Sequence, residues 1–150
     1  MAASLARPLA LDLPATVDGL RSGLAAIERH CAAADLPTSA VARTLTVFEE
    51  IFTNTMKYGY RDAVGARIRV VLAGGDPLRL VLEDAAPAFD PTAWNAKPDL
   101  TGDVADRPVG RAGIALVMGL ASSVRWEALA PGNRLTLELS ATAQKGEGTS

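Results

Sequence analysis

Two segments in the first half of the chain carry apolar residues at the spacing of one helix face. In residues 14–34 the apolar stripe consists of Val17, Leu20, Leu24 and Ile27. In residues 38–59 it consists of Val41, Leu45, Phe48 and Phe52. Thr16 can open the first segment, and Thr38 or Ser39 can cap the start of the second. Gly59 can end the second segment. The pattern therefore predicts two consecutive amphipathic helices.

Other segments alternate apolar and non-apolar residues, which is the pattern of a strand with one covered face. The leucines at positions 9, 11 and 13 predict a first strand over residues 6–13. Two hairpins follow later in the chain. Their strands are predicted at 66–73 and 78–83, with the turn Gly74-Gly75-Asp76-Pro77, and at 123–130 and 134–140, with the turn Pro131-Gly132-Asn133.

Between the two hairpins the pattern changes twice. Residues 92–108 are rich in Pro, Asp, Gly and Asn without a clear period, which predicts a long loop with one helical turn near Trp94. Residues 114–121 are apolar almost all round, which predicts a buried helix. We expect a single domain over residues 1–140 and a disordered tail over 141–150.

Composition narrows the class of protein. The 150-residue chain has a formal net charge of −2, so no basic surface for direct nucleic-acid binding is indicated. We expect no signal peptide and no membrane contact, and a cytoplasmic location, since no apolar run approaches a membrane span. Cys31 and His30 are the only cysteine and histidine, which excludes an internal disulfide and a zinc site of paired thiolates. We expect a partly buried Cys31 beside a surface histidine, not a catalytic pair.

The second predicted helix carries a carboxylate and an amide one turn apart. Glu50 and Asn54 share a face that lies roughly opposite Phe48 and Phe52. A carboxylate can accept a proton from a hydroxyl group or water, and an amide oxygen is a suitable Mg²⁺ ligand. Taken alone, the pair is more often a solvated helix face. Its significance therefore depends on the rest of the chain.

Two further features also allow both a functional and an ordinary structural interpretation. Asp84 ends a predicted strand and begins a loop, where a carboxylate can accept hydrogen bonds from an amino group such as that of adenine. Taken alone, Asp84 is more often a turn-former. Gly110 and Gly113 lie at the start of a helix, where unpaired N–H groups and the helix dipole favour an anion. Taken alone, such glycines also cap helices.

The order of these features carries more information than any one of them. An E-x-x-x-N helix, a strand ending in Asp, a long loop, a G-x-x-G helix start and a hairpin follow one another. This order resembles the nucleotide-binding domain of gyrase, heat-shock chaperone, histidine-kinase and mismatch-repair ATPases (the GHKL, or HATPase_c, superfamily). The chain is most similar to the small RsbW-like anti-sigma-factor serine kinases, over Leu9 to about Leu139. The segments that carry the resemblance are Glu50–Asn54, Glu83-Asp84 with Phe89-Asp90-Pro91, Arg107–Gly110 and Gly132–Leu137.

The resemblance implies a fold and a ligand. The fold would be α+β, a two-layer sandwich of the Bergerat type. Three main helices would cover one face of a mixed, mainly antiparallel sheet. The ligand would be ATP with Mg²⁺, bound between the helices and a mobile lid formed by residues 95–109.

The resemblance also implies roles for individual residues. Glu50 would be the general base that activates a partner serine, and Asn54 would hold Mg²⁺ against the ATP phosphates. Asp84 would receive the adenine amino group. Backbone N–H groups from Gly110 to Gly113 would contact the phosphates. Asn133 stands where the wider family often has a threonine near adenine.

The sequence departs from the family pattern at four positions. Tyr58 replaces a histidine, Ala86 replaces the glycine of the D-x-G turn, and Arg111 and Ala112 replace residues that are often Gly and Leu. A Cβ at Ala86 would narrow the nucleotide pocket, or cost about 1 kcal/mol if the position needs a positive φ. Arg111 would add a positive charge beside the phosphates.

Two functions of different class remain open. The first is an ATP-dependent protein-serine kinase and anti-sigma factor. It would bind a sigma factor or an analogous regulator and phosphorylate an antagonist of the anti-anti-sigma type. Homodimerisation of the chain is compatible with this function. The second is a protein-interaction module that has lost nucleotide binding. A third function, a catalytic domain that phosphorylates a histidine of a separate sensor protein, is the least expected of the three. No dimerisation helix pair carrying a phospho-acceptor is recognised before the domain.

Overall fold

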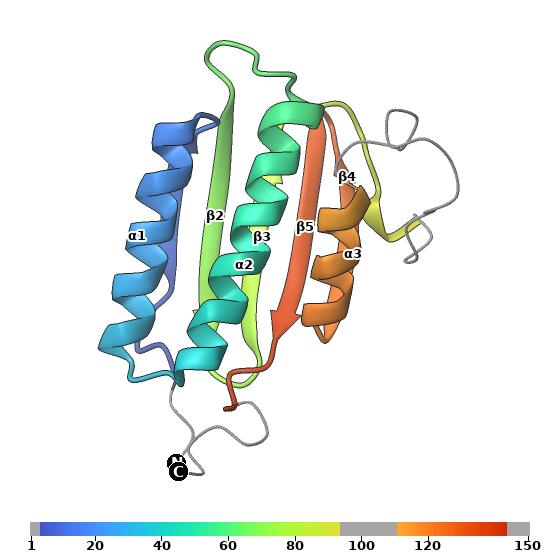
Figure 1. Cartoon of the computed structure of the whole chain (residues 1–150). Helices are drawn as coiled ribbons and strands as arrows, with labels where there is room; N and C mark the ends of the chain where they lie inside the picture. The colour runs from blue at the N-terminus through green and yellow to red at the C-terminus, as the bar shows by residue number, and fades with distance from the viewer. Residues whose placement is uncertain (1–3, 94–110, 144–150) are drawn as a thin grey trace.

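A five-stranded sheet with three helices on one face forms the structure (Figure 1). The computed structural model describes residues 4–93 and 111–143. The predicted lid 95–109, Gly110 and residues 144–150 of the predicted tail lie outside the described residues. The elements in chain order are β1 (Leu9–Pro14), α1 (Val17–Ala33), α2 (Thr38–Asn54), the π-helical segment η1 (Thr55–Gly59), β2 (Arg67–Gly74), β3 (Leu78–Asp84), the 3₁₀ turn η2 (Pro91–Ala93), α3 (Arg111–Leu120), β4 (Ser123–Leu129) and β5 (Gly132–Leu139).

The strands lie in the order β1-β2-β3-β5-β4. Each neighbouring pair among these strands is antiparallel. The two-layer α+β sandwich and both hairpins predicted from the sequence are therefore confirmed. The register between β3 and β5 sets Asp84 directly opposite Asn133, two residues that are far apart in the sequence. This pairing brings the end of β3 and the start of β5 together at one end of the sheet.

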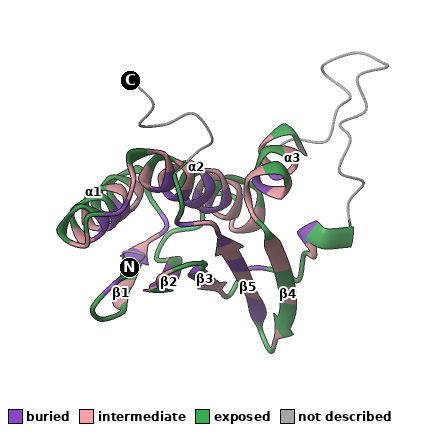
Figure 2. Ribbon diagram, turned by 90° about the horizontal axis from the view of Figure 1, so that it is seen from below, coloured by how far each residue is buried: buried purple, intermediate pink, exposed green. Residues whose placement is uncertain are grey.

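The hydrophobic core lies between the helix layer and the sheet (Figure 2). The strand residues that alternate toward the helices are buried, whereas Arg69 and Arg79 on the other face are exposed. Phe48 and Phe52 of α2 are fully buried, and their ring centroids are 5.4 Å apart. The face of α2 that carries these rings is therefore fixed against the sheet. The face that carries Glu50 and Asn54 is held in place as a consequence.

Helix α1 uses small residues for its close packing. Its N-cap is Thr16, whose side chain accepts a hydrogen bond from Gly19 N at 3.1 Å. The buried residues of the helix are Gly19, Gly23, Ile27 and Cys31. The predicted stripe is therefore wrong at Val17, which is 54% exposed. Cys31 is fully buried, not partly, and burial raises the pKa of its thiol.

Replacing Gly23 with alanine tests how closely α1 packs on α2. An added Cβ would lie 2.4 Å from Cζ of Phe48 and 2.9 Å from Cδ1 of Leu13. Since the core is close-packed, we expect Gly23→Ala to lower the free energy of unfolding by about 1–3 kcal/mol. Urea denaturation measures this change. The control is Ser22→Ala at the neighbouring exposed position, and an equal effect of the two substitutions would contradict the packing.

The start of helix α2 differs from the prediction. Its N-cap is Pro37, with no side-chain hydrogen bond to the helix, and Thr38 is already the first helical residue. The predicted cap by Thr38 or Ser39 is therefore wrong, because the extended backbone of Pro37 (φ −56°, ψ 145°) begins the helix one residue earlier. At the other end, α2 continues into the wider turn η1, which ends at Gly59 as predicted.

Two predictions for the C-terminal part need correction. Helix α3 packs against α2, and its Ile114 and Val117 are buried while Leu116 is 44% exposed. The expectation of a buried helix is therefore confirmed at Ile114 and Val117 and wrong at Leu116. Ala141 is also buried, and its N–H donates to Asp76 Oδ1 at 3.1 Å, so ordered packing extends past residue 140. In the described part of the chain, no helix has the length and apolar character to cross a membrane.

Candidate functional site

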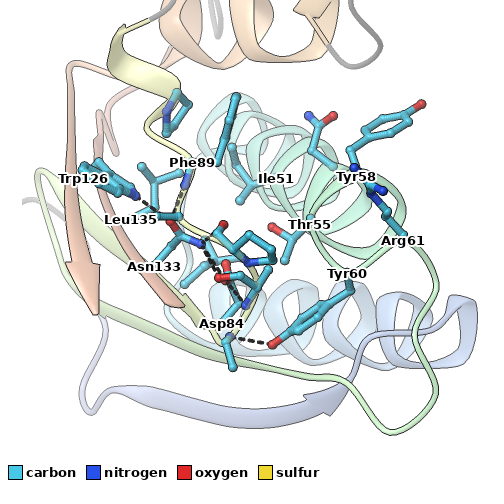
Figure 3. Close-up of a pocket in the computed structure, with 18 of the residues that line it drawn as sticks. Ile51, Thr55, Tyr58, Tyr60, Arg61, Asp84, Phe89, Trp126, Asn133 and Leu135 are labelled. Atoms are coloured by element: carbon cyan, nitrogen blue, oxygen red, sulfur yellow. Dashed lines mark hydrogen bonds between the residues drawn. The ribbon is translucent and has the colours of Figure 1, made fainter. Parts of the chain in front are cut away.

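A cavity of about 820 Å³ opens between the end of α2, the loop after β3 and strand β5 (Figure 3). Its size is in the range of small-molecule and cofactor sites. Apolar side chains from three elements form much of its wall, among them Ile51, Ile114 and Leu135. Asp84, Asn133 and Asn54 are among its polar residues. The cavity therefore brings together residues from most of the motifs recognised in the sequence.

Asp84 is held at this cavity by two hydrogen bonds to one of its oxygens. Its Oδ1 accepts from Ala86 N and from Asn133 Nδ2, each at 2.9 Å. Burial raises the pKa of the Asp84 carboxyl, and these two hydrogen bonds act in the opposite direction. Because both donors favour the ionised form, they stabilise a carboxylate in a partly buried place. Asp84 is thus a fixed acceptor at the cavity wall.

Asn133 is almost fully buried, with 8% of its surface exposed. Besides Asp84, its Nδ2 approaches the carbonyl oxygens of Ala86 at 3.3 Å and Pro87 at 3.2 Å. Its Oδ1 accepts from Phe89 N at 2.9 Å and from Trp126 Nε1 at 2.8 Å. The amide expected near adenine is therefore also the centre of a network that organises residues 84–89.

Ala86 adopts an unstrained backbone. In residues 4–93 and 111–143, the non-glycine residues with positive φ are Asp35, Arg61 and Asp62, so Ala86 is not one of them. The strain considered for an alanine at this turn does not arise. Ala86 is 2% exposed, and an added Cβ at Gly59 would lie 3.2 Å from Cβ of Ala86. The Ala86 methyl group therefore packs closely on η1 while lining the cavity.

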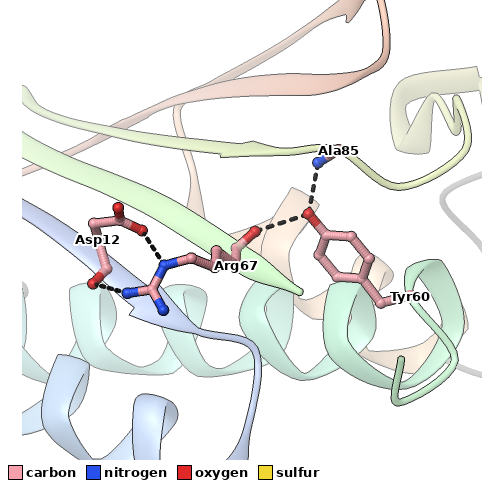
Figure 4. Close-up of polar contacts among 4 residues, drawn as sticks. All are labelled: Asp12, Tyr60, Arg67 and Ala85. Carbon is pink, nitrogen blue, oxygen red and sulfur yellow. Dashed lines mark hydrogen bonds and ion pairs between the residues drawn. The ribbon is translucent and has the colours of Figure 1, made fainter. Parts of the chain in front are cut away.

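Tyr60 is a cavity residue that the sequence reasoning missed. Its hydroxyl accepts from Ala85 N at 2.6 Å and donates to Arg67 O at 2.8 Å (Figure 4). Arg67 in turn donates from Nε to Asp12 Oδ1 at 2.9 Å. Burial raises the pKa of the Tyr60 hydroxyl above its ordinary value. Tyr60 joins the residue after Asp84 to the start of β2, a contact that no local pattern in the sequence indicates.

Helix α3 begins directly against the Glu50 and Asn54 face of α2. A Cβ added to Gly113 would lie 2.3 Å from Glu50 Oε2 and 3.4 Å from Asn54 Nδ2. The second glycine of the G-x-x-G pattern therefore provides the space that the Glu50 carboxylate occupies. Three of the predicted site residues thus lie together, and Asn54 also lines the cavity with Asp84.

Of the remaining residues singled out in the sequence, Tyr58 lies at the cavity, whereas the structure describes Arg111 only in part and Gly110 not at all. Tyr58, at the position of the family histidine, is 45% exposed and lines the cavity with Arg61 (Figure 3). Arg111 is the first residue of α3, but its side chain lies outside the described part, as does Gly110.

The donor groups in the cavity are compatible with a magnesium nucleotide. Among the described residues, no cluster of three His, Cys, Asp or Glu side chains could hold a metal ion by itself. Mg²⁺ commonly binds through one or two protein oxygens together with substrate phosphates and water. The amide of Asn54 beside a helix start suits this arrangement, whereas it does not suit zinc.

Residues 13–139 match the family model of the histidine kinase-like ATPase domain. The chain belongs to this family, and the resemblance recognised in its motifs is confirmed at that level. The fold is similar to that of the RsbU and RsbW domains of Rv1364c from Mycobacterium tuberculosis, with a TM-score of 0.63 and 20% sequence identity. This match covers 92% of the present chain but 33% of the other, so the chain spans about one third of the length of that solved chain. A search of curated proteins gave no match.

Proposed function

We propose that this cavity binds Mg²⁺-ATP, with the adenine amino group on Asp84. The observation that carries the proposal is the fixed, partly buried Asp84 carboxylate in a largely apolar cavity that also contains Asn54. The flat base of a nucleotide can lie between apolar walls. An ionised carboxylate only accepts hydrogen bonds, so it favours a base that carries an amino group over one that carries a carbonyl oxygen at the same position. The family match supports the same ligand, because ATPase domains of this family bind ATP.

The other residues have roles that follow from their chemistry. ATP supplies the phosphoryl group, and Mg²⁺ offsets the charge of the phosphates. Asn54 would provide an oxygen ligand to the metal, and N–H groups at the start of α3, from Gly110 to Gly113, would contact the phosphates. Glu50, whose carboxylate lies against Gly113, would accept the proton of a serine hydroxyl. The bond from the serine oxygen to the γ-phosphorus would form as the bond from that phosphorus to ADP breaks.

At the level of the cell, we propose a regulatory protein-serine kinase of the partner-switching type. It would bind a sigma factor or an analogous regulator and phosphorylate an antagonist protein, both in the cytoplasm. The motif resemblance and the fold similarity to a protein with an RsbW domain support this assignment. Homodimerisation is compatible with it. If ATP does not bind, the alternative function is that of a protein-interaction module that acts without a nucleotide.

Replacing Asp84 with asparagine tests the proposed ATP site. The substitution keeps the size of the side chain but removes the charge that strengthens a hydrogen bond from the adenine amino group. We expect ATP affinity to fall by about tenfold to a hundredfold, measured by isothermal titration calorimetry.

The control is Asp35→Asn, an exposed residue in the turn between α1 and α2 whose positive φ asparagine also tolerates. It should bind ATP as the parent does. Equal ATP affinity of Asp84→Asn and the parent would contradict the assignment.

A further inference from the structure

We propose that Asn133 is a positioning residue that gives the cavity its selectivity for a purine carrying a 6-amino group. It would do so by orienting Asp84 and the loop Ala85–Phe89, not by contacting the nucleotide. This inference rests on the proposed function, since Asp84 must be the group that receives the amino group. It concerns the selectivity of the same site.

The contacts of Asn133 support this role. A side-chain amide has two N–H donors and an oxygen with two acceptor positions. In Asn133 the N–H donors face Asp84 Oδ1 and the carbonyl oxygens of Ala86 and Pro87, and the oxygen accepts two hydrogen bonds. These contacts match its full hydrogen-bonding capacity. A nucleotide that contacted this amide directly would have to displace one of them.

The backbone at Gly132 brings Asn133 to this position. Gly132 has φ 113°, and a Cβ added there would lie 1.8 Å from the carbonyl oxygen of Asp84. Only glycine allows β5 to approach β3 so closely at this point. Asn133 then lies opposite Asp84 in the sheet register, with its amide within 2.9 Å of the carboxylate.

Trp126 fixes the orientation of the amide from the other side. Its indole Nε1–H can only donate, and it donates to Asn133 Oδ1 at 2.8 Å. Phe89 N–H donates to the same oxygen at 2.9 Å. These two donors require that the oxygen of the amide faces β4 and the loop. The NH₂ group therefore faces Asp84, and Asp84 Oδ1 is occupied, which orients the plane of the carboxylate (Figure 3).

A pair of nucleotides separates positioning from general structural support. Purine riboside triphosphate carries hydrogen in place of the 6-amino group of ATP. The parent protein should bind ATP about tenfold to a hundredfold more tightly, because only ATP donates to Asp84. In Asn133→Leu, which keeps a similar volume without the hydrogen bonds, we expect this ratio to fall toward one. The affinity for purine riboside triphosphate should change little.

A second variant guards against misfolding of the first. Asn133→Ala removes the same hydrogen bonds and adds no bulk, so its ratio should also fall toward one. Urea denaturation shows which variants are folded before titration. A parental ratio in either folded variant overturns the inference. An equal loss of affinity for both nucleotides overturns it as well, because it indicates structural support alone.

The Asp84→Asn variant distinguishes failure of the inference from failure of the proposed function. If Asp84→Asn abolishes the ATP preference and the folded Asn133 variants keep it, only the role of Asn133 is wrong. If the parent binds neither nucleotide, or if Asp84→Asn keeps the preference, the proposed ATP site is wrong and the role of Asn133 falls with it.

Discussion

Replacing Glu50 with glutamine is expected to slow phosphate transfer from ATP by about a hundredfold to ten-thousandfold. Glutamine keeps the length of the side chain and its place against Gly113, but it cannot accept the proton of the attacking hydroxyl. ATP affinity should stay near the parental value, because the proposed contacts to adenine and metal are made by Asp84 and Asn54. The rate is measured with γ-labelled ATP and an antagonist protein carrying the acceptor serine.

The matched control for this variant is Glu49→Gln. Glu49 precedes Glu50 on α2 and is exposed to solvent. The same change of charge at this position should leave the transfer rate unchanged. A parental rate in Glu50→Gln would show that Glu50 is not the base, whereas equal loss in both variants would point to net charge instead.

A second large effect is expected when Gly113 is replaced with alanine. The new Cβ would lie 2.3 Å from Glu50 Oε2, closer than real contacts allow. The carboxylate is the end of a flexible side chain, so it can swing away without unfolding the protein. We therefore expect phosphate transfer to fall by at least about tenfold, since a misplaced base loses most of its advantage. The free energy of unfolding should change by less than about 1 kcal/mol.

Gly119→Ala provides the control on the same helix. An added Cβ at Gly119 meets no atom within 4 Å. Since alanine is a better helix former, this variant should unfold with a free energy about 0.5–1 kcal/mol higher and transfer phosphate at the parental rate. If Gly113→Ala also behaves in this way, the close approach of α3 to Glu50 has no part in the reaction.

The fold was largely predictable because its elements have strong local patterns. The alternation in β2, β3 and β5 identifies their buried faces, and the spacing of Phe48 and Phe52 identifies the face of α2 that meets the sheet. Asn54 could be singled out by its spacing from Glu50 on one helix face, and Asp84 because it ends a predicted strand. Gly113 was recognised as a helix start, although its contact with Glu50 depends on how α3 packs.

The contacts within the site could not be predicted from local patterns. Asn133 meets Asp84 through the register of two strands, and Tyr60 meets Ala85 through the path of the chain after η1. Both are contacts between residues distant in sequence. The misjudged exposure of Val17 and of Leu116 has a related cause, since composition identifies an apolar helix but not how many of its sides are covered.

The central claim is that the cavity binds a magnesium nucleotide. The most direct measurement is calorimetric titration of the parent protein with Mg²⁺-ATP, and with ATP in the presence of a chelator. The expected result is saturable binding at one site per chain that weakens when Mg²⁺ is removed. Absence of binding at millimolar Mg²⁺-ATP would contradict it, and would leave a histidine kinase-like fold that acts by protein contacts alone.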